Sequence, residues 1–165
     1  MLSKALLHPL SSHLSVDPVR SRIMQAVGQK HTAPEMTVRR TLYALGYRFR
    51  VQRRDLPGSP DIVLRKHKTV IFVHGCFWHR HPLCKKATMP KTRLEFWTEK
   101  FDRNVARDQL TEIALRKMGW QVLIVWECET KSVEILAAKL ASAFTAEAYP
   151  SDSDLSGAGK RGEYF

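Results

Sequence analysis

The stretch TVIFVHGCFWHRHPLC, residues 69–84, joins a short apolar strand to a dense group of metal-binding side chains. The β-branched and aromatic residues 70–73 are typical of a buried strand. The next eleven residues, 74–84, contain two cysteines and three histidines, with Phe77 and Trp78 among them. Because a strand holds its end in a fixed place, groups directly after it can be aimed at a common target. The segment predicts a metal, a polar active site and an aromatic probe within one short piece of chain.

Further strand and helix signals surround this segment and predict an α/β domain. Residues 47–52 alternate apolar side chains with Arg48, Arg50 and Gln52, which is typical of a half-buried strand with a basic outer face. Residues 61–64 are a second strand signal, and the almost wholly apolar run 121–126 predicts a central strand covered on both faces. Helices are predicted over 19–27, between Thr32 and Gly46, over 93–118 and over 132–146. The expected fold is a mixed sheet with helices packed on it.

Composition indicates a basic protein that binds a polyanion. Lysine and arginine total 27 against 16 acidic residues, which gives a formal net charge of +11. Nucleic acid is the commonest partner for such an excess, and the alternative is a basic face without a ligand. A membrane surface fits less well because no basic amphipathic helix stands out.

The chain is long enough for one domain with a substantial core, at 165 residues and 44% apolar side chains. We expect a flexible extension over 1–16, a domain over 17–148 and a disordered tail over 149–165. The extension lacks the apolar region of a signal peptide, and no apolar run reaches membrane-spanning length, so a cytoplasmic location is expected. All three cysteines lie between positions 76 and 128, which favours metal ligation in a reducing compartment over a disulfide framework.

The cysteines and histidines have the spacing of a zinc site. Cys76, His81 and Cys84 are separated by four and two residues, so thiolate and imidazole could surround one tetrahedral ion. Cys128, at the end of another predicted strand, is the remaining cysteine and the natural fourth ligand. His74 or His79 could replace His81, and the spacing leaves that choice open. The alternative is a set of free buried cysteines and surface histidines.

A second group of residues points to phosphodiester hydrolysis. Asp61 opens a strand after a tight turn, where a carboxylate can bind Mg²⁺, or can simply cap the turn. With Mg²⁺ on the phosphate, a nearby histidine could activate water. Asp108 could orient that histidine through its other ring nitrogen, or could be a solvated helix carboxylate. Glu35 stands three residues after Thr32, which is the pattern of a helix capping box.

Five blocks of sequence, in order and spacing, resemble the very-short-patch repair (Vsr) DNA mismatch endonucleases. The blocks are PGSPD at 57–61, VIFVHGCFWHRH at 70–81, EFWTEK at 95–100, NVARD at 104–108 and GWQVLIVWEC at 119–128. The resemblance covers about residues 17–130. It implies a restriction-endonuclease-like fold with structural zinc, and Mg²⁺-dependent nicking of duplex DNA 5′ to the thymine of a T:G mismatch. Such mismatches arise when 5-methylcytosine deaminates, and the nick starts their repair.

The resemblance also implies a role for individual residues. Asp61 becomes the Mg²⁺ ligand with the backbone carbonyl of Val73, and His79 becomes the general base with Asp108 behind it. His74 and Glu35 line the active site. The implied zinc ligands are Cys76, His81, Cys84 and Cys128.

The implied DNA contacts come from two regions. Phe77, Trp78 and Trp97 enter the base stack beside the mismatch, where planar rings offset part of the unstacking cost. Trp97 also lies on an apolar helix stripe, so a core position is the alternative. Phe77 and Trp78 are adjacent and would point in opposite directions in an extended chain, so at least one is expected to pack locally. The N-terminal helix, with Arg20, Arg22, Ile23 and Met24, would clamp the DNA.

The expected partner is duplex DNA with a T:G mismatch, bound by a monomer, and other mismatch-repair proteins are candidate partners. Two alternative functions share these residues. One is a restriction-type endonuclease that cuts both strands. The other is a non-catalytic zinc module that binds DNA, in which Asp61 and His79 are incidental.

Overall fold

The computed structural model describes residues 31–51 and 53–145, and the compact unit that begins at Ala33 is the subject below. Its helices are α2 (Ala33–Ala44), α3 (Leu94–Lys117) and α4 (Val133–Thr145). Its strands are β1 (Arg50–Val51), β2 (Ile62–Leu64), β3 (Thr69–His74) and β4 (Gln121–Trp126), and two 3₁₀ helices are η1 (Arg65–His67) and η2 (Glu127–Lys131). The predicted extension 1–16, the N-terminal helix with Arg20, Arg22, Ile23 and Met24, and the tail 149–165 lie outside the described residues. None of the described helices is long and apolar enough to cross a membrane.

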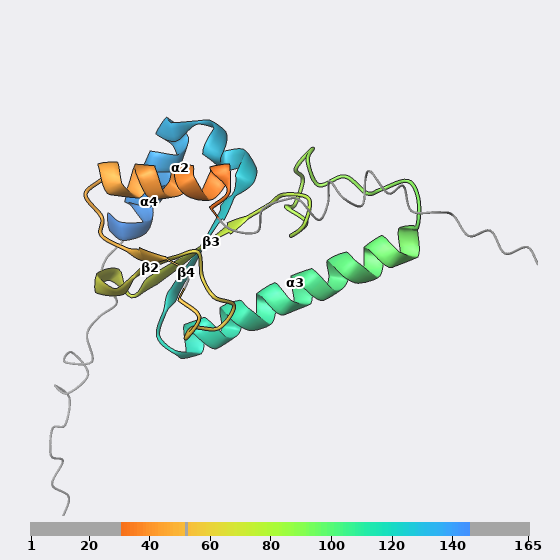
Figure 1. The fold of residues 1–165 in the computed structure, drawn as a ribbon, viewed down its shortest axis with the longest axis horizontal. Coiled ribbons are helices and arrows are strands. Elements are labelled where there is room, and N and C mark those ends of the chain that lie inside the picture. Colours follow the sequence, from red (N-terminus) through yellow and green to blue (C-terminus); the bar gives the residue numbers. More distant parts are fainter. Residues whose placement is uncertain (1–30, 52, 146–165) are drawn as a thin grey trace, which may run out of the picture. The chain divides into compact units, whose positions relative to one another are not determined.

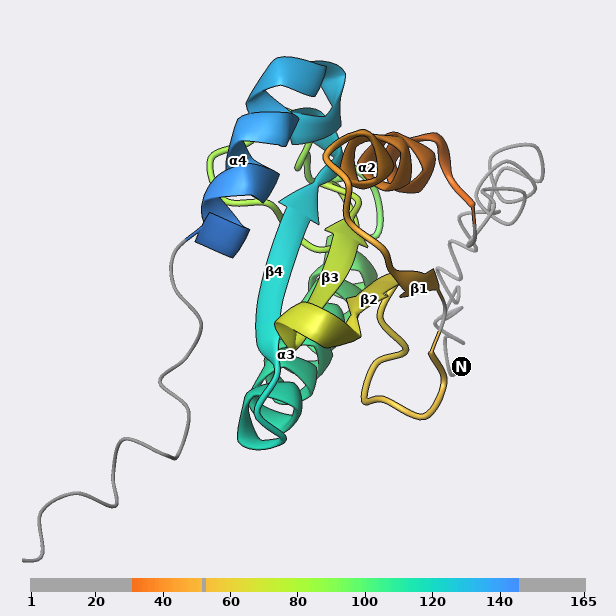
Figure 2. The same ribbon diagram turned by 90° about the vertical axis from the view of Figure 1, so that its left-hand side faces the viewer.

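The four described strands form one mixed sheet in the order β1-β2-β3-β4, which confirms the predicted α/β class (Figure 2). β1 with β2 and β2 with β3 pair antiparallel, while β3 and β4 run parallel. A parallel pair needs a long crossover connection, and α3 supplies it. The parallel register sets His74 beside Trp126, so the end of the histidine-bearing strand lies next to the end of β4.

Two strand predictions need correction. Among residues 47–51, the described part of the strand expected over 47–52, only Arg50–Val51 is a strand, although Tyr47 and Phe49 do pack against the core. The run 121–126 does form a strand, but within the described sheet it lies at the edge and not in the centre. The predicted cover on both faces is confirmed, because buried Val125 packs toward α4 and buried Val122 packs toward α3.

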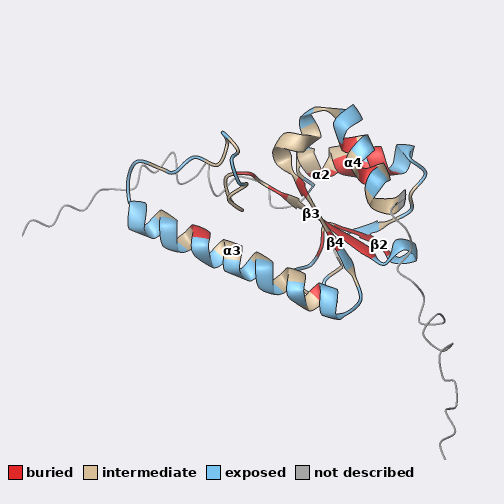
Figure 3. Ribbon diagram, turned by 180° about the vertical axis from the view of Figure 1, so that it is seen from behind, coloured by how far each residue is buried: buried red, intermediate tan, exposed pale blue. Residues whose placement is uncertain are grey.

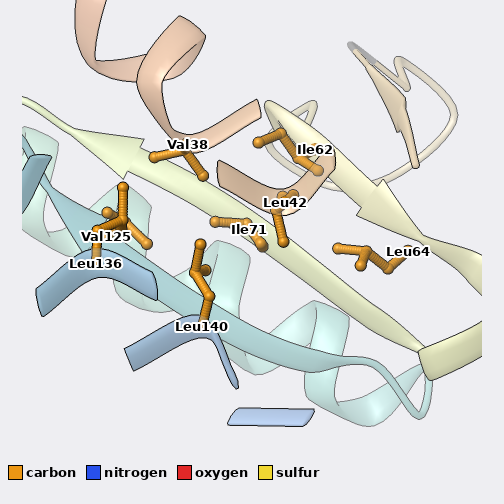
Figure 4. Packing of buried hydrophobic residues seen from close by; sticks show 8 residues of the cluster. All are labelled: Val38, Leu42, Ile62, Leu64, Ile71, Val125, Leu136 and Leu140. Carbon is orange, nitrogen blue, oxygen red and sulfur yellow. The ribbon is translucent and has the colours of Figure 1, made fainter. Parts of the chain in front are cut away.

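The main core lies between the sheet and the helices α2 and α4, which cover the same face (Figures 1 and 4). Its fully buried members come from both helices and from three strands: Val38, Leu42, Ile62, Leu64, Ile71, Val125, Leu136 and Leu140. Alternating strand residues face the other side, where Val63 and Val70 pack with Leu115 of α3. The sheet therefore has a helical layer on each face.

Helix α3 reaches well beyond the sheet, and most of its surface is exposed (Figures 1 and 3). Phe101 and Leu115 are its two buried residues, one in each half. Leu115 anchors the C-terminal half to the sheet, and Phe101 contacts the ring of Phe77 in the loop after β3. The helix ends at Lys117, and Gly119, two residues later, has a φ of +77° that suits glycine. The loop after β3 and the N-terminal half of α3 are thus held together beyond the sheet.

The turn before β2 depends on a glycine. Gly58 has a φ of +68°, and a Cβ atom at this position would lie 2.3 Å from Cγ2 of Thr111 on α3. A larger residue there would push the turn away from the helix. The close approach fixes the chain three residues before Asp61, and this is how the PGSPD block positions its carboxylate.

Candidate active site and metal centre

Asp61 lies at the start of β2, beside the end of β3. Its Oδ2 accepts a hydrogen bond of 2.8 Å from the backbone N–H of Val73. Burial raises the pKa of Asp61 to about 6, and the negative charge of Glu35 acts in the same direction. The Val73 N–H, Arg39 and His79 act in the opposite direction and keep the pKa from rising further. A half-buried carboxylate whose charge is poorly compensated is a suitable site for a hard cation.

Glu35 and Arg39 form a buried ion pair on α2. Arg39 Nη2 donates to Glu35 Oε2 at 2.8 Å, and the two side chains are 9% and 6% exposed. Both residues act electrostatically on Asp61, so the pair belongs to the surroundings of the active site. The resemblance implied an active-site role for Glu35, and the structure adds Arg39 as its cationic partner. The spacing of four residues on a helix is the signal from which this pair could have been predicted.

Replacing Arg39 with methionine is expected to lower the free energy of unfolding by about 3–5 kcal/mol, because it leaves a buried carboxylate without its cation. The matched control is Arg116→Met. Arg116 pairs with Glu112 at the same helical spacing, at 2.7 Å, but its side chain is 55% exposed. The control should cost about 0.5 kcal/mol or less. Urea unfolding at pH 7 measures the free energy of unfolding of both variants. Equal losses in the two would show that burial of the Glu35–Arg39 pair does not add to the cost.

The histidine–carboxylate group consists of His74, His79 and Asp108. Nδ1 of His79 lies 2.5 Å from Oδ2 of Asp108, and the rings of His74 and His79 stack with centroids 3.9 Å apart. This contact leaves Nε2 of His79 for a proton from another molecule. Burial lowers the pKa of His74 to about 4, with a further contribution from His79. His74 is therefore neutral at pH 7, and its stacked ring brings no second positive charge to His79.

The thiol–histidine group consists of Cys76, His81, Cys84 and Cys128, whose ligand atoms all lie within 4.8 Å of one another. Nδ1 of His81 is 3.6 Å from the sulfur of Cys76 and 3.3 Å from that of Cys128. In a tetrahedral zinc site, sulfur and nitrogen ligands lie about 3.5 Å apart. Three sulfurs and one imidazole at these distances fit zinc well. The residues come from the loop after β3 and from η2.

The pKa values of Cys76 and Cys84 are shifted by their surroundings. Burial raises the pKa of Cys76 to about 12, and hydrogen bonds with Cys128 and Cys84 contribute. The backbone N–H of Lys86 lowers the pKa of Cys84. A thiol as buried as Cys76 becomes a thiolate only when a cation stabilises it, so metal binding at this group would release protons.

The aromatic cluster lies next to both groups and consists of Phe77, Trp78, Phe96, Trp97 and Phe101. Phe77 contacts Trp78 edge-to-face at 5.0 Å and Phe101 at 5.1 Å, which confirms that at least one of the two adjacent rings packs locally. The rings lie together because residues 76–80 form turns and not extended chain. Trp97 is half-buried in this cluster and belongs to neither core.

Polar contacts hold the aromatic cluster on α3 and give it a positive charge. Nδ2 of Asn104 donates to the carbonyl of Trp78 at 3.2 Å. The Lys100 ammonium lies 5.1 Å from the ring centroid of Trp78 and 5.5 Å from that of Trp97. Partly exposed rings beside a lysine are suited to stacking on bases while the cation meets the phosphate backbone.

Comparison with known proteins identifies the family. A family model described as DNA mismatch endonuclease Vsr matches residues 16–86. The type II nicking enzyme V.XorIIP of Xanthomonas oryzae pv. oryzae is 49% identical over 126 residues, 76% of this chain and 92% of that enzyme. The chain belongs to the Vsr family. The DNA mismatch endonuclease Vsr of Escherichia coli is 46% identical over 117 residues, 71% of this chain and 74% of that protein.

As a member of the Vsr family, the chain is a DNA endonuclease and a hydrolase. A third relative, the type II nicking enzyme V.NmeAIP of Neisseria meningitidis, is 45% identical over 121 residues, 73% of this chain and 86% of that enzyme. The resemblance found in the five sequence blocks is thereby confirmed.

The structure of this Vsr-family chain also shows which histidine lies with the thiols, a choice that the spacing left open. His81 faces two of the three thiols, whereas His74 and His79 gather with Asp108. Asp108 contacts His79, as predicted, and also lies 3.6 Å from Arg107. Val73 contributes its N–H to Asp61, and the role of its carbonyl remains a proposal.

Sequence reasoning missed three residues of this Vsr-family site: Arg39, Asn104 and Trp126. Asn104 opens the NVARD block, so its place in a family motif was a usable signal. Trp126 lies in the block at 119–128, which was the same kind of signal, but it looked like one more apolar residue of β4. Its contacts appear only when β3 and β4 are paired.

Proposed function

We propose that this protein nicks one strand of duplex DNA 5′ to the thymine of a T:G mismatch, by Mg²⁺-dependent hydrolysis. The nick would start the repair of deaminated 5-methylcytosine. The observation that supports this most directly is the His79–Asp108 pair, stacked on a neutral His74 and within electrostatic reach of a half-buried Asp61. An acid that attracts a cation and a histidine with a free nitrogen are the two parts that phosphodiester hydrolysis requires.

In this proposal Asp61 and the carbonyl of Val73 would hold Mg²⁺, which polarises the scissile phosphate and stabilises the leaving oxygen. His79 accepts a proton from the attacking water at Nε2. Asp108 accepts the Nδ1–H of His79, which selects the tautomer with a free Nε2 and stabilises the charged ring once it has taken the proton. Glu35, held by Arg39, adds negative charge beside Asp61.

The thiol–histidine group would hold one structural zinc ion, since four protein ligands leave no open position for a substrate. Cys76 follows the end of β3 directly, and His79 and His81 belong to the same loop. Closing this loop around an ion would therefore restrict the general base and the rings of Phe77 and Trp78 together. The restriction-endonuclease-like fold expected from the resemblance is part of the proposal.

Mismatch selectivity would come from the aromatic cluster. A T:G pair opens at a lower energy cost than a matched pair. The rings of Phe77, Trp78 and Trp97 would stack on the bases at the opened step and recover part of that cost. Lys100, which lies over two of these rings, would neutralise a neighbouring phosphate.

A strand-resolved nicking assay tests the proposed function. Two end-labelled duplexes differ at a single position, T:G in one and C:G in the other, and each is incubated with and without Mg²⁺. We expect one nick, in the thymine strand, on the mismatched duplex and in the presence of Mg²⁺. Equal cleavage of the two duplexes would refute mismatch specificity. Cleavage of both strands would identify a restriction-type enzyme, and binding without cleavage would identify a non-catalytic zinc module.

A further inference from the structure

Trp126 lies beside His74 because of the parallel register of β3 and β4. The two residues are direct partners in the ladder, so their side chains project from the same face of the sheet. Buried Val70 and Val122 precede them by four residues on the same strands and therefore lie on the same face, which packs toward α3. The rings of His74 and Trp126 meet edge-to-face, with centroids 5.5 Å apart and an interplanar angle of 72°.

The same indole also stacks on the thiol–histidine group. The ring of His81 lies parallel to Trp126, with centroids 4.2 Å apart and an interplanar angle of 10°. Trp126 thus contacts one imidazole of each group. From His74 the contacts continue through the stacked ring of His79 to Asp108. Four rings in sequence therefore connect the thiols to the general base: His81, Trp126, His74 and His79.

The backbone that carries Trp126 is fixed from two directions. Its N–H donates to Oε2 of Glu129 in η2 at 2.7 Å. Lys139 of α4 binds the same carboxylate at 2.7 Å and also donates to the carbonyl of Ile124 at 2.9 Å. A ring with only two side-chain torsions on such a backbone has little freedom to move. Trp126 is therefore a rigid spacer between the two groups.

We propose that Trp126 is a positioning residue that couples the thiol–histidine group to the general base. The inference rests on the proposed roles of zinc and His79. The indole packs edge-to-face against the ring of His74 and limits its rotation. The stacked ring of His74 in turn keeps His79 in the orientation that Asp108 and the substrate require. Displacement of a reacting group by about 1 Å can reduce a rate about 100-fold. The zinc-bound loop would then set the angle of the base through the indole, in addition to the covalent chain between His79 and His81.

The test compares Trp126→Met and Trp126→Phe with a matched control, Trp120→Met. Methionine fills much of the volume of the indole but provides no plane. Trp120 precedes β4 by one residue, packs against the core on the α3 face and touches neither group. In single-turnover nicking of the T:G duplex, we expect Trp126→Met to lose about 10- to 100-fold in rate and Trp126→Phe about threefold. The control should keep the wild-type rate.

Three further measurements separate positioning from folding. Zinc content and the dissociation constant for the duplex should stay at wild-type values in both Trp126 variants. The ring nitrogen signals of His79, observed by long-range ¹H–¹⁵N NMR of the zinc-loaded protein, should move in Trp126→Met and stay in place in Trp120→Met.

Several outcomes would overturn the proposal. The proposal fails if folded Trp126→Met keeps both the wild-type nicking rate and the wild-type His79 signals. It also fails if Trp120→Met changes the rate and the His79 signals as much as Trp126→Met does. If both Trp126 variants lose zinc, the residue supports only the thiol–histidine group, and the coupling is refuted. If the wild-type protein does not nick the mismatched duplex, the proposed function fails, whereas the NMR comparison still decides whether Trp126 orients His79.

Discussion

Replacing Asp61 with asparagine is expected to abolish nicking and, at the same time, to make the Mg²⁺-free, zinc-loaded protein more stable at pH 7. Asparagine has nearly the same shape, and its side-chain oxygen can still accept the hydrogen bond that Val73 gives Asp61. It lacks the negative charge that a hard cation requires, so the rate should fall by at least about 10³-fold. Binding of the duplex should remain.

The gain in stability follows from the direction of the pKa shift. The folded-state pKa of Asp61 is about 6, against an ordinary value of 3.8. Because the folded state binds this proton more tightly, the stabilisation from protonation is complete below about pH 4 and is lost as the pH rises through about 6. At pH 7 the wild-type protein carries the full cost of the buried charge, which is about 3 kcal/mol at most.

Thermal unfolding of the zinc-loaded protein in buffer without Mg²⁺ measures this effect at several pH values. The asparagine variant should melt several degrees above the wild type at pH 7–8, and the two should converge near pH 4. Adding Mg²⁺ should stabilise the wild type and leave the variant unchanged. A variant that is less stable than the wild type at every pH would show that the charge of Asp61 is well compensated in the folded protein.

Replacing Cys128 with serine is expected to unfold the region around the thiol–histidine group. Binding of a structural zinc ion contributes roughly 10 kcal/mol or more. The net stability of a domain is only about 5–15 kcal/mol, so most of it would be lost. We expect zinc content to fall from about one ion per chain to near zero, and DNA binding and nicking to fail together. The wild-type protein treated with a strong zinc chelator should behave in the same way.

A histidine variant provides the control for this prediction. His81→Asn should lose zinc as Cys128→Ser does, because its imidazole faces two of the thiols. His67→Asn should keep zinc, since His67 is exposed in η1 and packs against Tyr47 and Phe144. Zinc analysis and circular dichroism distinguish the variants. If Cys128→Ser folds completely without zinc, the thiol–histidine group does not hold a structural ion.

The elements of the fold were largely predictable because their signals are local. The long helix after residue 93 and the strands at 61–64, 69–74 and 121–126 follow from apolar periodicity, and Gly119 marks the turn between α3 and β4. The strand at 47–52 was overpredicted because alternation shows only that Tyr47 and Phe49 face the core. Pairing with a neighbour depends on the position of β2, which the local pattern does not contain.

The residue types of the site were also predictable, and so was the family, because five motifs occur in a fixed order along the chain. Which histidine joins which group was not predictable from spacing, since His74, His79 and His81 all lie within reach of the same cysteines in an extended chain. The turns at residues 76–80 decide the matter by directing His81 toward the thiols and His79 toward Asp108.

The sequence by itself determined the chemistry of residues 69–84 of this Vsr-family nuclease: a strand, three histidines, two thiols and the two aromatic rings of Phe77 and Trp78. Only the tertiary structure decided how these groups are divided and connected. The parallel pairing of β3 with β4 brings Trp126 and Cys128 beside a segment about fifty residues away, and α3 brings Asp108 to His79. Contacts between distant segments depend on the packing of whole elements, and no local pattern specifies them.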